Sequence, residues 1–246
     1  MNRFSLTLTI ALTCMPPASQ TKPADSADLD AVLKKMDAAA ASFRSTQADF
    51  EWDTYEKVID EIDEIQTGTI YFRRTGKDIE MMADVKMAGS DLTKLKPEPK
   101  YVLYSNGKVS MYQPKPDQVT VYDLGKNRVD LETYVVLGFG GSGQDLVKAF
   151  DVTYLGPETI NGVVTAHGVA TAKLQLIPKS DKVRNTYNRI LLWIDLDKGI
   201  SVQQQFFSPQ GDFRLTKYSS INEKKIPDDV FKLKTTGKTQ TISPKG

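Results

Sequence analysis

Alternation of apolar and polar side chains along short runs is the feature that most constrains the fold of this chain. Ala48, Phe50 and Trp52 alternate with acidic residues, and the same period of two returns between Ile79 and Met87. A period of two places successive side chains on opposite faces of a strand. The sequence therefore predicts strands that each present one apolar face.

Turn signals separate several of these runs. Asn106-Gly107 and Asn161-Gly162 each stand between two apolar runs and suit tight hairpin turns. Other strand-like runs are Val119 to Leu124, Val152 to Leu155, His167 to Ala170, Leu174 to Ile177, Arg189 to Leu196, Ser201 to Phe207 and Phe213 to Tyr218. The expected class is mainly β (α+β), with about ten strands in an antiparallel sheet that curls into an incomplete β-barrel.

One helix is predicted before the strands. Asp28 is a suitable N-cap residue, and apolar residues follow it at helical spacing. They are Leu29, Val32, Leu33, Met36, Ala40 and Phe43. We expect this apolar stripe to lie against the sheet.

The composition fits one globular domain. The chain has 246 residues, of which 40% are hydrophobic, and 32 Lys and Arg residues stand against 31 Asp and Glu residues. This balance gives no electrostatic reason to expect nucleic acid as a partner. We expect a monomer.

The N-terminus resembles an export signal. Arg3 precedes an apolar run, Phe4 to Met15, that is too short to span a bilayer, and Pro16-Pro17 ends it. We expect residues 1–19 to be a signal peptide, residues 20–28 a linker and residues 29–246 the domain, in the periplasm. Cys14 follows an imperfect lipobox, so a membrane-anchored lipoprotein is the alternative.

The stretch from Asp130 to Phe150 interrupts the strands. Its apolar residues flank a glycine-rich joint, Gly138 to Gly143, and predict two short helices that form a lid over one mouth of the sheet. The glycines also fit the G-x-G-x-x-G nucleotide fingerprint. That motif needs a full crossover helix after it, whereas only Gln144 to Phe150 precede the next strand. We therefore expect no nucleotide cofactor.

Residues typical of catalytic or metal sites are scarce. His167 is the only histidine and has no Ser or Cys nucleophile motif near it. The acidic run from Asp60 to Glu64 lacks EF-hand spacing, and Asp195 and Asp197 suit a turn. We expect no enzyme activity, no metal and no cofactor.

Motifs in the last third of the chain carry a family resemblance. They are Leu176-Ile177-Pro178-Lys179, Trp193-Ile194-Asp195, Ser219-Ser220-Ile221-Asn222 and Ile226-Pro227-Asp228-Asp229-Val230-Phe231. In this order they resemble the outer-membrane lipoprotein carrier (LolA) family, within the LolA/LolB-like superfamily. The resemblance implies an apolar cavity that encloses acyl chains beneath a helical lid.

The resemblance also implies site residues. An arginine on an early strand is expected to donate hydrogen bonds to lid carbonyls when the carrier is empty, and the run Ile70 to Arg74 nominates Arg74, or else Arg73. The predicted lipid-binding residues are Phe50, Trp52, Ile70, Phe72, Arg74, Met81, Tyr134, Leu137, Phe139 and Leu146.

The implied function is a periplasmic carrier that takes lipoprotein acyl chains, or another lipid, from the inner to the outer membrane. Its implied partners are an inner-membrane lipoprotein-releasing transporter and an outer-membrane acceptor. A membrane-anchored lipoprotein receptor or envelope-stress sensor of the same fold is the alternative, and a secreted enzyme is a third.

Overall fold

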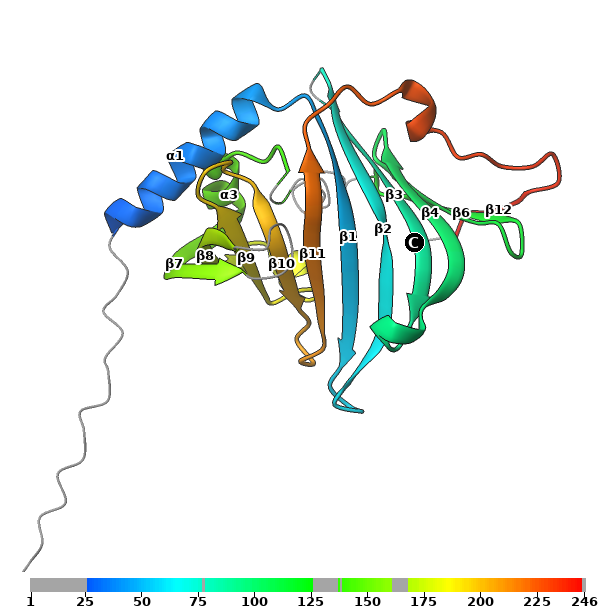
Figure 1. Cartoon of the computed structure of the whole chain (residues 1–246), viewed down its shortest axis with the longest axis horizontal. Helices are drawn as coiled ribbons and strands as arrows, with labels where there is room; N and C mark the ends of the chain where they lie inside the picture. Colours follow the sequence, from blue (N-terminus) through cyan, green and yellow to red (C-terminus); the bar gives the residue numbers. More distant parts are fainter. Residues whose placement is uncertain (1–25, 77, 126–136, 138, 161–167, 245–246) are drawn as a thin grey trace, which may run out of the picture.

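A computed structural model describes residues 26–76, 78–125, 137, 139–160 and 168–244 of the chain. Its main element is one sheet of 12 strands in the order β12-β6-β5-β4-β3-β2-β1-β11-β10-β9-β8-β7 (Figure 1). The strands are β1 Ser45–Glu56, β2 Glu61–Thr75, β3 Asp78–Gly89, β4 Lys96–Ser105, β5 Lys108–Gln113, β6 Gln118–Asp123, β7 Phe150–Ile160, β8 Val169–Pro178, β9 Arg189–Asp195, β10 Ser201–Phe207, β11 Phe213–Asn222 and β12 Gln240–Ile242. The sheet is open, with β12 and β7 at its edges.

Hairpins explain most of the strand order. Neighbours in sequence pair antiparallel from β1 to β6 and again from β7 to β11, and β1 also pairs with β11, which joins the two halves. Asn106 and Gly107 have φ of 52° and 70°, as a tight turn between β4 and β5 requires. This predicted hairpin is confirmed. β7 also pairs with β8, beginning at Ile160 and Val169, whereas Asn161-Gly162 lies outside the described residues.

The prediction of a purely antiparallel sheet is wrong at one edge. β12 pairs parallel with β6, with Gln240 opposite Gln118. The three residues of β12 are exposed and show no apolar alternation, so the periodicity that revealed the other strands does not mark this one.

Two helices cover one half of the sheet, and we call the covered face the inner face. α1 (Ser26–Ser42) and α3 (Gly143–Ala149) lie over β7 to β10 (Figure 1). The helix-covered cluster comprises Val32, Met36, Leu137, Leu146, Phe150, Ala172, Leu174, Leu176, Ile190, Leu192 and Ile194. α1 begins at Ser26, which places Asp28 in its first turn instead of at the predicted cap.

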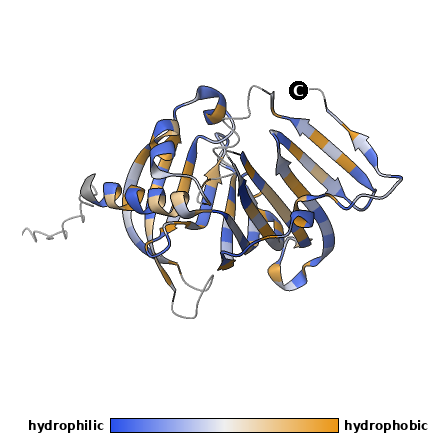
Figure 2. Cartoon of the chain, turned by 90° about the horizontal axis from the view of Figure 1, so that it is seen from above, coloured by the Kyte–Doolittle hydropathy of each residue, from blue (hydrophilic) through white to orange (hydrophobic). Residues whose placement is uncertain are grey.

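A second apolar cluster occupies the inner face over the other half of the sheet. This central cluster comprises Phe43, Ala48, Phe50, Ile70, Phe72, Ile79, Ala83, Val85, Phe139, Ile200 and Tyr218. Register places it on the same face as the helix-covered cluster, because Leu192, Gln204, Thr216 and Trp52 are successive cross-strand neighbours. Figure 2 shows the alternating hydropathy along the strands.

The C-terminal segment covers part of the opposite, outer face. We call residues 223–244 the strap. It contains a short 3-10 helix, η3 (Asp228–Phe231), and Ile226 and Phe231 are buried there with Met82 of β3. Other short helices are η1 (Leu92–Lys94) and α4 (Asp181–Arg184). Among the described residues, no helix has the length and apolar character needed to cross a membrane.

Candidate functional site

The central cluster brings six of the predicted lipid-binding residues together. Phe50, Ile70, Phe72 and Phe139 belong to it, and the half-buried Trp52 and Met81 pack against it. Their positions follow from strand alternation, because Phe50 and Trp52 share the inner face of β1 while Ile70 and Phe72 share that of β2. The rings of Phe50 and Trp52 have centroids 4.2 Å apart.

Phe139 fills the middle of this cluster from outside the sheet. Its side chain is 0% exposed. Its ring stacks on Phe72 at a centroid distance of 4.9 Å and meets Tyr218 edge-on at 4.7 Å. Burial raises the pKa of Tyr218 well above its ordinary value. Phe139, from the predicted lid segment, thus packs at the centre of an apolar inner face.

Arg74 bonds the same lid segment. Its Nη2 donates to the carbonyl oxygen of Gly140 at 2.7 Å, and its guanidinium lies 5.9 Å from the ring centre of Phe43. The Nε of Arg74 is buried and has no hydrogen-bond acceptor among the described residues. A cation at the end of β2 therefore bonds the main chain next to Phe139.

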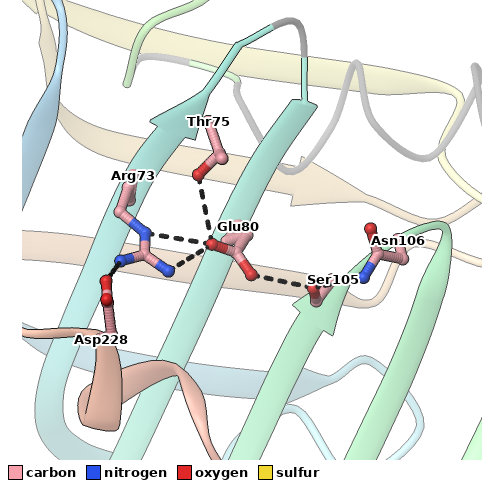
Figure 3. A network of polar contacts seen from close by, with 6 residues as sticks. All are labelled: Arg73, Thr75, Glu80, Ser105, Asn106 and Asp228. Atoms are coloured by element: carbon pink, nitrogen blue, oxygen red, sulfur yellow. Dashed lines mark hydrogen bonds and ion pairs between the residues drawn. The ribbon is translucent and has the colours of Figure 1, made fainter.

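Arg73 points to the opposite face. Its guanidinium bonds Glu80 and Asp228 (Figure 3). It also lies 4.2 Å from the ring centre of Phe231, so it attaches the strap to β2. Burial opposes the charge of Arg73, but its bonds to these carboxylates outweigh that effect and raise its pKa. Of the two arginines nominated from the sequence, Arg74 is the one that contacts the predicted lid segment, at Gly140.

Glycines allow the lid to approach the helix closely. Gly140 has φ of +85°, and a Cβ there would lie 2.7 Å from the ring of Phe43. A Cβ on Gly143 would lie 2.5 Å from the carbonyl oxygen of Leu33 in α1. This close packing gives the glycine-rich joint a role that involves no nucleotide.

Gln204 is a lid contact that sequence reasoning missed. Its amide Nε2 donates to the carbonyl oxygen of Leu137, and its side chain is almost fully buried. A signal in the sequence could have found it. Gln204 stands two positions before Phe206 in a strand-like run, and a period of two places both side chains on the same face of the sheet.

The other predicted lid residues lie elsewhere. Leu137 and Leu146 belong to the helix-covered cluster, because α3 packs on α1 and β7. Tyr134 and the first predicted lid helix lie outside the described residues.

No group of three or more potential metal ligands occurs in the described part of the chain. Asp195 accepts hydrogen bonds from the main-chain nitrogens of Asp197 and Lys198, as a turn residue does. His167 and Cys14 lie outside the described residues. The contacts around Phe139 thus consist of apolar groups and of hydrogen bonds from two side chains of the sheet, Arg74 and Gln204.

Comparisons with known proteins identify the fold. No protein-family model and no curated protein matches the sequence. Among solved structures, MucB aligns over 90% of this chain and 67% of its own, with a TM-score of 0.50 and 13% identity. An uncharacterized conserved protein from Thermus thermophilus aligns over 89% of this chain and 100% of its own, with a TM-score of 0.51 and 11% identity.

A LolA superfamily protein from Nitrosomonas europaea is also similar, over 83% of this chain and 97% of its own, with a TM-score of 0.39 and 13% identity. At such identities the likeness concerns the fold alone.

Proposed function

We propose that the chain is an exported carrier that encloses acyl chains of lipoproteins or other lipids and moves them between membranes. The observation that supports the proposal is the placement of Leu137, Phe139 and Gly140 in the predicted lid segment. Its Phe139 fills the apolar central cluster, while Arg74 bonds its main chain. In this proposal the sheet curls around a cavity that cargo enters when Phe139 leaves the cluster.

The free energy of burying acyl chains favours a lid that competes with cargo for the apolar face. A tri-acylated anchor has on the order of 45 methylenes, which at about 0.8 kcal/mol each correspond to over roughly 30 kcal/mol on removal from water. This exceeds the practical limit of about 20 kcal/mol for noncovalent affinity. A carrier must therefore hold its cargo less tightly than the accepting membrane does. Bonds that form only in the empty state lower net affinity in this way.

Native mass spectrometry with lipid extraction tests the proposal on protein purified from an envelope fraction without detergent. We expect stoichiometric acyl lipid or lipoprotein on the mature chain. The proposal is wrong if the chain is empty and also fails to take up a fluorescent fatty acid. An inner-membrane transporter, an outer-membrane acceptor and a monomeric state belong to the same proposal.

The second candidate is a membrane-anchored receptor or envelope-stress sensor. MucB, which shares the fold, has been crystallised in complex with MucA, so a protein ligand is a further candidate for this chain. Cys14 supports this alternative through its imperfect lipobox. Mass spectrometry of the mature N-terminus separates the two, because acylated Cys14 indicates an anchored protein whereas cleavage after it indicates a diffusing carrier.

A further inference from the structure

A buried amide lies on the inner face, with an apolar residue opposite it on β9 and the buried Thr216 opposite it on β11. Gln204 is 4% exposed, and its cross-strand neighbour Leu192 is 0% exposed. Its Nε2 donates to the carbonyl oxygen of Leu137. The donor that Gln204 presents to the inner face is thus satisfied by the main chain of the lid.

A second donor group faces the same segment. Arg74 bonds the carbonyl oxygen of Gly140, so two side chains of the sheet bond lid carbonyls on either side of Phe139. Its Nε is buried without an acceptor among the described residues. Among the described residues, the sheet therefore presents one buried donor near Phe139, the Nε of Arg74, that no acceptor satisfies.

Displacing the lid removes these acceptors. In the proposed carrier, Phe139 leaves the central cluster when cargo enters, and the carbonyls of its near neighbours Leu137 and Gly140 then no longer accept from Gln204 and Arg74. A buried donor left without an acceptor is costly. Hydrocarbon chains offer no acceptor, whereas the carbonyl oxygen of an ester or amide is equivalent to the peptide carbonyl that it replaces.

We infer that Gln204 determines specificity for lipids whose chains are attached through ester or amide carbonyls. In the empty protein its amide bonds Leu137, and in the loaded protein it bonds a carbonyl oxygen of the cargo, with the Nε of Arg74 as a second donor. A site that satisfies a buried donor discriminates against analogues that lack the acceptor. This inference rests on the proposed carrier function and adds the linkage chemistry of the cargo.

Two matched probes test it on the delipidated full chain. One is dioleoylglycerol, with ester-linked chains, and the other is the glycerol ether with the same two chains, which lacks both carbonyls. We expect the wild type to bind the ester roughly 5- to 100-fold more tightly than the ether. Equal binding of the two probes overturns the inference but leaves the carrier function standing, whereas failure to bind either overturns both.

Variants assign the preference to Gln204. Gln204→Met keeps the volume but removes the donor, so its preference for the ester is expected to fall severalfold. Thr216→Val alters a buried polar neighbour in the same cross-strand row and is expected to keep the wild-type preference. Gln204→Asn, which shortens the amide by one carbon, is a second test if the Met variant does not fold. An unchanged preference in the folded Gln204 variants overturns the assignment.

Discussion

Two consecutive arginines have different roles because a strand alternates its faces. Arg74 shares the inner face of β2 with Ile70 and Phe72, whereas Arg73 bonds Glu80 on the outer face. We expect Arg74→Leu to fold but to release cargo to an acceptor about tenfold more slowly, because the empty closed state loses a charged hydrogen bond. Transfer of labelled cargo to acceptor vesicles measures this. Arg73→Leu, the control, should transfer normally, and wild-type transfer by Arg74→Leu would remove Arg74 from the mechanism.

A methyl group at Gly140 tests how tightly the lid closes. Gly140→Ala strains a left-handed residue and also places Cβ against the ring of Phe43, so we expect a lid that exchanges its amide hydrogens faster. Gly76 is the matched control, since it has φ of +64° and open space around its Cβ position. Gly76→Ala should lose about 1–2 kcal/mol of unfolding free energy without faster lid exchange. Equal rates of amide hydrogen exchange in the lid of both variants would contradict the close packing of Gly140 against Phe43.

At the scale of elements, the C-terminal end of the strap bonds one carboxylate at the turn between β5 and β6. Asp117 accepts hydrogen bonds from the hydroxyls of Thr236 and Thr239, which lower its pKa below the ordinary value. A lowered folded pKa stabilises the attached strap above the unfolded pKa, and this contribution disappears as the pH falls through the folded pKa. We expect the amide chemical shifts of β12 to move toward random-coil values as the pH falls below about 4.

The matched variant for the strap is Asp117→Ala. It should speed tryptic cleavage at Lys238 near neutral pH, whereas Asp123→Ala, which loses an exposed ion pair with Lys108, should not. Equal cleavage of the two variants would show that Asp117 does not hold the strap.

The sequence predicted those elements whose signals, such as turn residues or apolar spacing, lie within a few residues of one another. The hairpin at Asn106-Gly107 and the apolar stripe of α1 follow from turn chemistry and helical spacing. Residues 70–74 also alternate, which favours Arg74 over Arg73 on the face with Phe72. The bond from Gln204 to Leu137 spans 67 residues, and β12 reaches β6 across more than 100. Such pairings depend on the three-dimensional course of the chain, which periodicity does not specify.

At the scale of the whole molecule, the two faces of the sheet differ in chemistry. The inner face carries the two apolar clusters and the lid, whereas the outer face near its centre carries Glu51, Asp53 and Lys217. Burial raises the pKa of Asp53 even though Lys217 bonds it, and one of its oxygens has no hydrogen-bond partner among the described residues. We therefore expect the ion cluster on β1 and β11 to make the stability of the sheet centre depend on pH.

Lys217→Met tests this coupling. It leaves the two carboxylates of Glu51 and Asp53 without their cation. Because the side chains of Lys217 and Glu51 are 29% and 24% exposed, we expect the free energy of unfolding to fall by about 1–2 kcal/mol at pH 7. A folded pKa above the unfolded value means that stability is lost as pH rises through it and regained as pH falls. The urea midpoint of this variant should therefore approach that of the wild type as the pH is lowered from 7 toward the ordinary pKa of an aspartate, about 4. Lys148→Met, which breaks an exposed pair with Asp145, should change little at either pH. A deficit of equal size at both pH values would mean that Lys217 acts through packing and that Asp53 does not titrate with the sheet.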